Sequence, residues 1–277
     1  MELKITEVQT SKVTFIDLIH LTLFVVITFA LHFNSMTRSV VIFLIPFLII
    51  WGRKLKTSNK MITLFVLFII GGYASLTLKE FLDTRTNQWF FNNDYYIIMS
   101  RFTLLIYITP FLFFWWISKK VPRYLKIGSF INTIYTPFIW KGIKDPIWRA
   151  LSVACVINLV FFSFFIDIPS NSLDILKLLY ISILFAIINA SLEEILWRGL
   201  LLSYFVDAIG ERKGLLLTSF GFGLYHLSMG FSIWISLCFV LAGLFFGGLA
   251  IRSKGIFPAF ILHFLINILM VMSGIIF

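Results

Sequence analysis

The chain has 277 residues, of which 60% are hydrophobic and only 13% are charged, with a mean hydropathy of +0.97. Soluble domains usually carry about 25% charged residues, and this apolar content is too large for one soluble core to hide. The composition therefore excludes a soluble domain and predicts an integral membrane protein. The net charge of +10 arises from Lys and Arg in short loops, which favours contact with a lipid surface and not with nucleic acid.

Nine apolar segments approach the length of about 20 residues that a helix needs to cross a bilayer. In chain order they are 14–33, 39–52, 61–79, 95–118, 148–167, 174–206, 213–230, 232–251 and 256–276. The second segment is short and is alternatively a re-entrant helix. The predicted fold is therefore all-α, a polytopic transmembrane helix bundle of about eight to nine spans.

The distribution of basic residues predicts the orientation of this bundle. Most Lys and Arg residues fall in one set of alternate loops, whereas only Arg38, Lys79 and Arg85 fall in the other. Cytoplasmic loops carry the excess of basic residues, so we expect the N-terminus inside and the C-terminus outside. We expect a multi-pass protein of a plasma membrane, and the aromatic, glycine-poor composition favours a bacterial one.

The longest loop, residues 119–147, is basic and contains prolines and aromatic residues. It divides the chain into an N-terminal four-span region, 1–147, and a five-span region, 148–277. We expect this loop to be a cytoplasmic connector that lies on anionic headgroups. A docking surface for a partner protein is the alternative.

Charged residues stand in the middle of the sixth predicted span, where each costs about 2.5–3.5 kcal/mol on insertion scales. They are Glu193, Glu194 and Arg198. Glu194 and Arg198 are four residues apart on one helix face, so we expect them to pair. Glu193 is rotated by roughly 100° from Glu194 and lacks that partner. A desolvated carboxylate without a partner suits a general base, so Glu193 is the candidate to activate a nucleophile.

Two later spans add polar groups to this region. The seventh contains Phe222 and His226, and the ninth contains His263 and Asn267, which are also four residues apart. Glutamate, two histidines and an asparagine on three nearby helices would form a hydrolytic site. By their depth along the helices, we expect this site to open toward the cytoplasm. Arg101, near the outer end of the fourth span, is expected to extend to the headgroups.

Motifs of other intramembrane proteases are absent from the sequence. It contains no His-Glu-x-x-His zinc motif, no Gly-x-Gly-Asp aspartyl motif and no Gly-x-Ser-x-Gly nucleophile elbow. The polar set described above therefore points to a different class.

Three motifs in this order resemble those of the CPBP (CAAX protease/bacteriocin-processing, Abi) family. They are Glu193-Glu194-x-x-x-Arg198, Phe222-x-x-x-His226 and His263-x-x-x-Asn267. The family includes the Ras-converting CAAX endopeptidase and bacterial membrane proteins linked to bacteriocin processing and self-immunity. The resemblance covers about residues 150–272, and it departs from the usual pattern only in Trp197, where a phenylalanine is common.

The resemblance implies an endopeptidase that hydrolyses a peptide or protein tail at the lipid bilayer. It implies that Glu193 activates the attacking water and that His226 orients it. His263 and Asn267 would stabilise the tetrahedral oxyanion. The supporting residues would be Glu194 and Arg198, which hold the helix, and Phe222, which packs the site.

The need for a metal is left open by the sequence. Two histidines and a glutamate could bind zinc, with Glu193, His226 and His263 as ligands. We favour a glutamate-activated water without any cofactor, because a closely spaced ligand pair is missing.

Two other functions remain as alternatives. A non-proteolytic membrane partner could act in bacteriocin self-immunity or regulate a sensor kinase. A transporter or proton channel would also contain intramembrane acids, but the two halves show no repeat.

Overall fold

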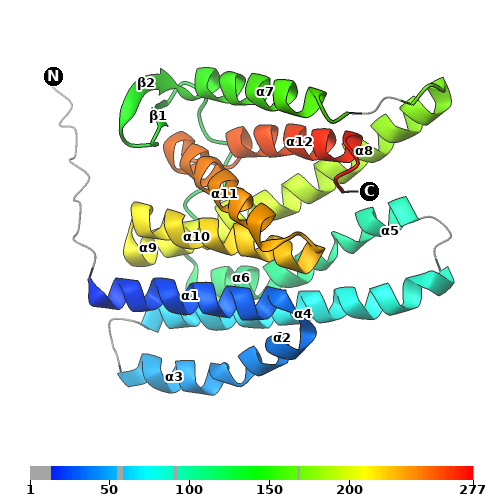
Figure 1. Cartoon of the computed structure of the whole chain (residues 1–277). Helices are drawn as coiled ribbons and strands as arrows, with labels where there is room; N and C mark the ends of the chain where they lie inside the picture. The colour runs from blue at the N-terminus through cyan, green and yellow to red at the C-terminus, as the bar shows by residue number, and fades with distance from the viewer. Residues whose placement is uncertain (1–13, 55–58, 90–92, 167–168, 277) are drawn as a thin grey trace, which may run out of the picture.

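The structure is a computed structural model that describes residues 14–54, 59–89, 93–166 and 169–276 (Figure 1). Within these ranges nearly all regular structure is helical, and the strands form a single short hairpin. The prediction of an all-α polytopic helix bundle is confirmed.

Six helices precede the long loop in the part of the N-terminal region that the structure describes. They are α1 (Phe15–Phe33), α2 (Ser35–Ile42), α3 (Leu44–Lys54), α4 (Asn59–Trp89), α5 (Asn93–Ser100) and α6 (Thr103–Ser118). After the loop come α7 (Ile147–Ser163), α8 (Ser172–Glu194), the π-helix η2 (Ile195–Leu202), α9 (Ser203–Ile209), α10 (Glu211–Tyr225), the 3-10 turn η3 (His226–Met229), α11 (Ile233–Ser253) and α12 (Phe257–Met272).

Within the described ranges, six helical segments are long and apolar enough to cross a membrane. They are Phe15–Phe33, Ser35–Gly52, Asn59–Arg85, Tyr95–Ser118, Ser172–Ile209 and Ile233–Ser253. The apolar helices α7 and α12 are shorter, with 17 and 16 residues. The expected span at 213–230 is the 15-residue helix α10 followed by the turn η3. The count of eight to nine spans and the orientation therefore stay predictions.

Local sequence signals determine where several helices begin. Thr14 and Asp17 form a capping box at the start of α1, in which each side chain bonds the other residue's backbone N–H. The side chains of Asn171 and Ser232 cap α8 and α11 in the same position. Asp17 also binds Nζ of Lys213 at 2.6 Å, so the start of α1 is connected to α10.

Helix α10 lies at the centre of the bundle, in contact with α1, α9 and α11 (Figure 1). Helix α12 packs against both α7 and α8 on one side, and α1 lies beside α4 on the other. One buried core contains Phe24 of α1, Phe68 of α4 and Trp197 of η2. The helices before and after the long loop therefore share a core, and α10 with its neighbours is fixed from both sides.

The loop at 119–147 contains a β-hairpin that the sequence did not predict. Its strands are β1 (Thr133–Pro137) and β2 (Gly142–Pro146), paired antiparallel. Gly142 adopts φ 130°, and a Cβ there would collide with the Thr136 carbonyl oxygen, so glycine is required. Arg252 Nε donates to Thr133 O at 2.8 Å, which attaches the hairpin to the end of α11. These contacts are long-range, and a search for apolar spans gives no sign of them.

Candidate active site

The candidate site is built around a change of helix type in the longest apolar segment. Glu193 and Glu194 are the last residues of α8, and the helix widens into η2 directly after them. Both acids are fully buried. Short π-helical segments are rare and are frequently found at functional sites.

Glu194 forms the centre of a buried ionic cluster. Its Oε1 atom accepts from Nη1 of Arg198 at 2.7 Å and from Nδ1 of His263 at 2.8 Å. The guanidinium of Arg198 also lies over the ring of Phe222, 4.1 Å from its centroid. The predicted Glu194–Arg198 pair is therefore present, and it is joined by a residue of α12. These contacts connect three helical elements through one carboxylate.

Glu193 has a different environment although it is the adjacent residue. Neither of its carboxylate oxygens has a hydrogen-bond partner among the described residues. Its nearest basic atom is Nε2 of His263, 3.6 Å from Oε2, which is too long for a hydrogen bond. A buried carboxylate is normally satisfied, so this one is available to a molecule that enters the site.

His226 is held in a fixed orientation. It is the first residue of η3, and its Nδ1 lies 2.8 Å from the carbonyl oxygen of Phe222. Its ring stacks on Phe239 with centroids 3.7 Å apart and an interplanar angle of 11°. Because Nδ1–H donates to the carbonyl, Nε2 carries the free lone pair. His226 can therefore accept a hydrogen bond or a proton at Nε2.

These side chains line one cavity of about 280 Å³. Its polar lining includes Glu193, His226, His263 and Asn267, while Glu194 and Arg198 lie behind it. Nδ2 of Asn267 has no partner within the described chain. The remaining walls are mostly apolar, with Phe185, Phe222, Phe231, Phe239, Phe246, Ile266 and Met270 among them. The cavity thus combines a free carboxylate, an oriented imidazole and a free amide donor in an apolar surrounding.

Comparison with known protein families identifies the segment that contains the cavity residues of α8, α10, α11 and α12. Residues 175–269 match the family model of type II CAAX prenyl endopeptidase Rce1-like proteins. This segment is Rce1-like. The match confirms the resemblance to the CPBP family that the three motifs indicate. At the general level, the family supports an endopeptidase that is a multi-pass membrane protein. No curated protein and no solved structure matches the chain.

The Rce1-like segment contains every residue of the three motifs, from Glu193 to Asn267. It runs from the first turn of α8 into α12, so it includes η2, α10 and α11 as well. Helices α1 to α6, the hairpin and α7 lie outside it.

The mouth of the cavity lies at the end of the bundle that is opposite the hairpin. Among its lining residues, Gly230 and Ile275 are exposed, and they follow η3 and α12 (Figure 1). With the predicted orientation this end faces outward, so the predicted orientation and the expected cytoplasmic opening do not both hold. His226 is four residues from Gly230, about 8 Å along a 3-10 helix. Depths measured from the opposite helix ends do not include this shorter route.

Two residues of the cavity were not assigned from the sequence. Asn189 precedes Glu193 by one turn, is 4% exposed, and has an unpartnered Oδ1. The sequence feature that could have identified Asn189 is its spacing of four residues from Glu193, which places both on one helix face. Arg101 lies at the junction of α5 and α6, and it lines the cavity instead of extending to the headgroups. The sequence feature that could have identified Arg101 is a charged residue inside an apolar span, because such residues usually belong to functional sites.

A catalytic zinc site needs three protein ligands close together. Within the part of the chain that the structure describes, no group of three or more His, Cys, Asp or Glu side chains is arranged to hold a metal ion. The ligand set considered for zinc (Glu193, His226 and His263) is therefore not assembled as a coordination shell. No step below is derived through a metal.

Proposed function

We propose that this chain is a membrane endopeptidase in which Glu193 activates a water molecule to hydrolyse a peptide bond. The observation that carries this proposal is the contrast between two adjacent buried acids. Glu194 is bound by Arg198 and His263, whereas Glu193 has both oxygens free in the cavity. A general base needs a free lone pair within reach of the nucleophile.

In the first step a water molecule lies between Glu193 and His226. Glu193 takes one proton of this water, and Nε2 of His226 accepts the other hydrogen as a hydrogen bond. The water oxygen then forms a bond to the carbonyl carbon of the peptide. The apolar cavity walls strengthen these polar interactions, because few competing water molecules are admitted.

The carbonyl oxygen becomes an oxyanion in this step. Asn267 Nδ2 is a free donor on the cavity wall and would stabilise that charge. His263 directs Nδ1–H to Glu194, so it can donate from Nε2 as well only when it is an imidazolium. Loss of one oxyanion donor typically costs about 2.7–4 kcal/mol of transition-state stabilisation.

In the last step the tetrahedral intermediate collapses. The bond between the carbonyl carbon and the peptide nitrogen breaks, and Glu193 returns its proton to the leaving amine. The products are a carboxylic acid and an amine, and Glu193 is again a carboxylate. Neither Glu194 nor Arg198 exchanges a proton, which agrees with their place behind the cavity wall.

Comparison of released peptides in cells tests this proposal. Wild type, Glu193→Gln and the control Glu211→Gln are expressed at equal membrane levels, and membrane and secreted peptides are identified by mass spectrometry. We expect at least one product that is present with wild type and Glu211→Gln and absent with Glu193→Gln. Identical peptide sets in all three would refute the proposal, and a cellular phenotype kept by Glu193→Gln would favour a non-proteolytic partner.

A further inference from the structure

Arg101 brings a cation into the catalytic cavity from outside the Rce1-like segment. It lies in the turn between α5 and α6, and its side chain is partly buried. It lines the same cavity as Glu193, His226 and Asn267. Helices that carry none of the family motifs therefore contribute to the site.

The guanidinium of Arg101 has weak partners only. Nη1 donates to the thioether sulfur of Met229 at 3.3 Å, and the group lies 5.4 Å from the centroid of Phe185. The Tyr225 side chain lies beside it in a small neighbouring pocket. Its Nε has no partner, and no carboxylate of the described residues forms an ion pair with it. A thioether is a poor acceptor, so much of the donor capacity of Arg101 is unused.

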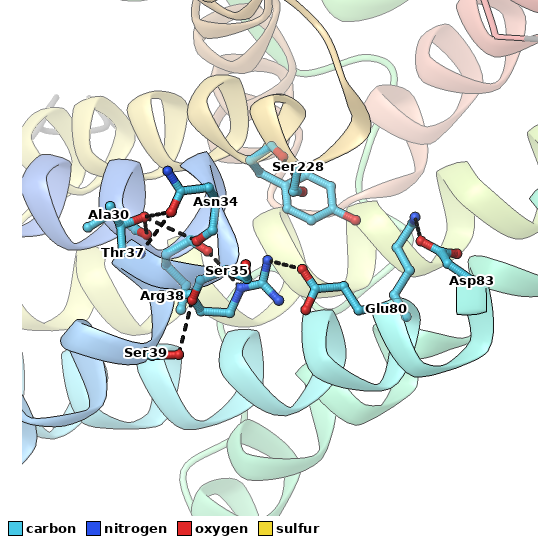
Figure 2. Close-up of polar contacts among 12 residues, drawn as sticks. Ala30, Asn34, Ser35, Thr37, Arg38, Ser39, Glu80, Asp83 and Ser228 are labelled. Atoms are coloured by element: carbon cyan, nitrogen blue, oxygen red, sulfur yellow. Dashed lines mark hydrogen bonds and ion pairs between the residues drawn. The ribbon is translucent and has the colours of Figure 1, made fainter. Parts of the chain in front are cut away.

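Other cations in the bundle have acidic partners. Nη2 of Arg38 binds Glu80 at 2.8 Å, and Nζ of Lys79 binds Asp83 at 2.9 Å (Figure 2). Arg198 binds Glu194. Lys79 and Arg101 even line one small neighbouring pocket, yet only Lys79 is paired there. Arg101 therefore differs from these three cations, because it lines the catalytic cavity without an acidic partner among the described residues.

An unpaired cation inside a membrane bundle is unfavourable and generally has a function. Arginine presents a planar set of donors that matches the two oxygens of a carboxylate. The only acid that lines the cavity among the described residues is Glu193, which the proposed reaction needs as a free base. The matching anion must therefore arrive with the ligand.

We propose that Arg101 binds a carboxylate of the peptide substrate and so places the scissile bond against Glu193. This inference rests on the proposed function and adds the substrate class, which is a peptide with a carboxylate close to the cleaved bond. The carboxylate is either the C-terminus or an Asp or Glu side chain, since both present the same two oxygens. Arg101 is thus a specificity-determining residue.

Binding and cleavage of matched peptides test this inference. The probes are a defined set of peptides, each made in three forms. The first form has a free C-terminus and an Asp side chain, the second has a C-terminal amide and the Asp, and the third has a C-terminal amide and Asn, so that it carries neither carboxylate. Binding is measured by calorimetry on full-length Glu193→Gln protein in nanodiscs, where no cleavage occurs. Arg101→Gln, Arg101→Lys and the exposed control Arg212→Gln are each combined with Glu193→Gln. Cleavage is measured with the same changes in protein that retains Glu193.

We expect at least one carboxylate form to bind at least about tenfold more tightly than its uncharged form, as for other charge-assisted pairs. Arg101→Gln should abolish this preference, Arg101→Lys should keep part of it, and Arg212→Gln should keep all of it. In cleavage, Arg101→Gln should lower kcat/KM for that form to about the value for the uncharged peptide, and should change kcat/KM of the uncharged peptide much less. The preferred form shows whether the C-terminus or a side chain is bound.

Failure of this inference differs from failure of the proposed function. Glu193-dependent cleavage without a carboxylate preference, or with a preference that survives Arg101→Gln, overturns the role of Arg101 and leaves the protease intact. A uniform loss of binding for all peptides in Arg101→Gln also overturns it, because that pattern indicates a structural role. An Arg101-dependent preference without any cleavage supports carboxylate binding and refutes the protease.

Discussion

Nδ1 of His263 lies 2.8 Å from Oε1 of Glu194, the same oxygen that accepts from Arg198. One carboxylate therefore orients an imidazole of α12 and neutralises a guanidinium of η2. The neighbouring carboxylate of Glu193 has no hydrogen-bond partner within the described ranges. Adjacent acids in one helix thus have separate tasks, since the first faces the cavity and the second holds its walls together.

This division predicts opposite effects on stability for the same substitution at two adjacent positions. Glu194→Gln should lower the free energy of unfolding by about 3–5 kcal/mol, because it leaves Arg198 buried without its counter-ion. Glu193→Gln should leave stability near that of wild type or raise it, since it removes a buried charge that has no hydrogen bond among the described residues. Thermal unfolding of both variants in the same detergent measures the difference.

The control for this comparison is a surface pair. Asp207→Asn removes the partner of Arg123 in an ion pair in which both side chains are largely exposed, and such pairs contribute about 0–1 kcal/mol. Equal destabilisation by Glu193→Gln and Glu194→Gln would contradict the assignment of one acid to structure and the other to chemistry.

The orientation of the bundle can be measured with single cysteines. In a background with Cys155→Ala and Cys238→Ala, Lys141→Cys places a thiol in the turn of the hairpin, and Ile275→Cys places one at the cavity mouth. The excess of basic residues near the hairpin predicts that this end is cytoplasmic. A membrane-impermeant maleimide should label Ile275→Cys on intact cells and Lys141→Cys only after permeabilisation. The reverse pattern would place the cavity mouth in the cytoplasm and refute the N-in orientation.

Sequence patterns predict contacts within one helix better than contacts between helices. The Glu194–Arg198 pair follows from a spacing of four residues, and so does the placement of His263 and Asn267 on one face. The bond from His263 to Glu194 spans 69 residues, and no local pattern contains it. Arg101 shows the same limit. Its position near the end of an apolar segment predicts contact with the lipid headgroups, whereas the packing of the helices places it on the cavity wall. The hairpin was missed because its strands are only five residues long and its contact with α11 joins residues more than 100 positions apart.

The chemistry predicts that cleavage does not depend on an added metal. No three ligand side chains are assembled in the described part of the site, and the water is activated by a carboxylate in the proposed reaction. Dialysis of purified protein against a chelator should leave the Glu193-dependent cleavage rate unchanged, and added zinc should not raise it. Loss of cleavage on dialysis, with recovery in zinc and not in magnesium, would show that the site rearranges to bind a metal.

The contact between α10 and α11 gives a prediction that is independent of the chemistry. A Cβ at Gly223 would collide with Val240 Cγ2 and lie only 2.6 Å from the backbone oxygen of Ser236. A Cβ at Gly247, in the same contact, would collide only with the terminal methyl of Leu215, and the next atom is 3.7 Å away. Backbone atoms cannot move without displacing a helix, whereas a leucine methyl can rotate away.

Gly223→Ala should therefore destabilise the protein by about 1–3 kcal/mol, the usual range for overpacking. Gly247→Ala should be nearly neutral, since the better helix propensity of alanine offsets a small rearrangement by up to about 1 kcal/mol. Gly223 is adjacent to Phe222 and three residues before His226, so Gly223→Ala should also lower the cleavage rate. Thermal unfolding and cleavage assays on the two variants test both effects. Equal stability of the two variants would contradict the close packing of α10 on the backbone of α11.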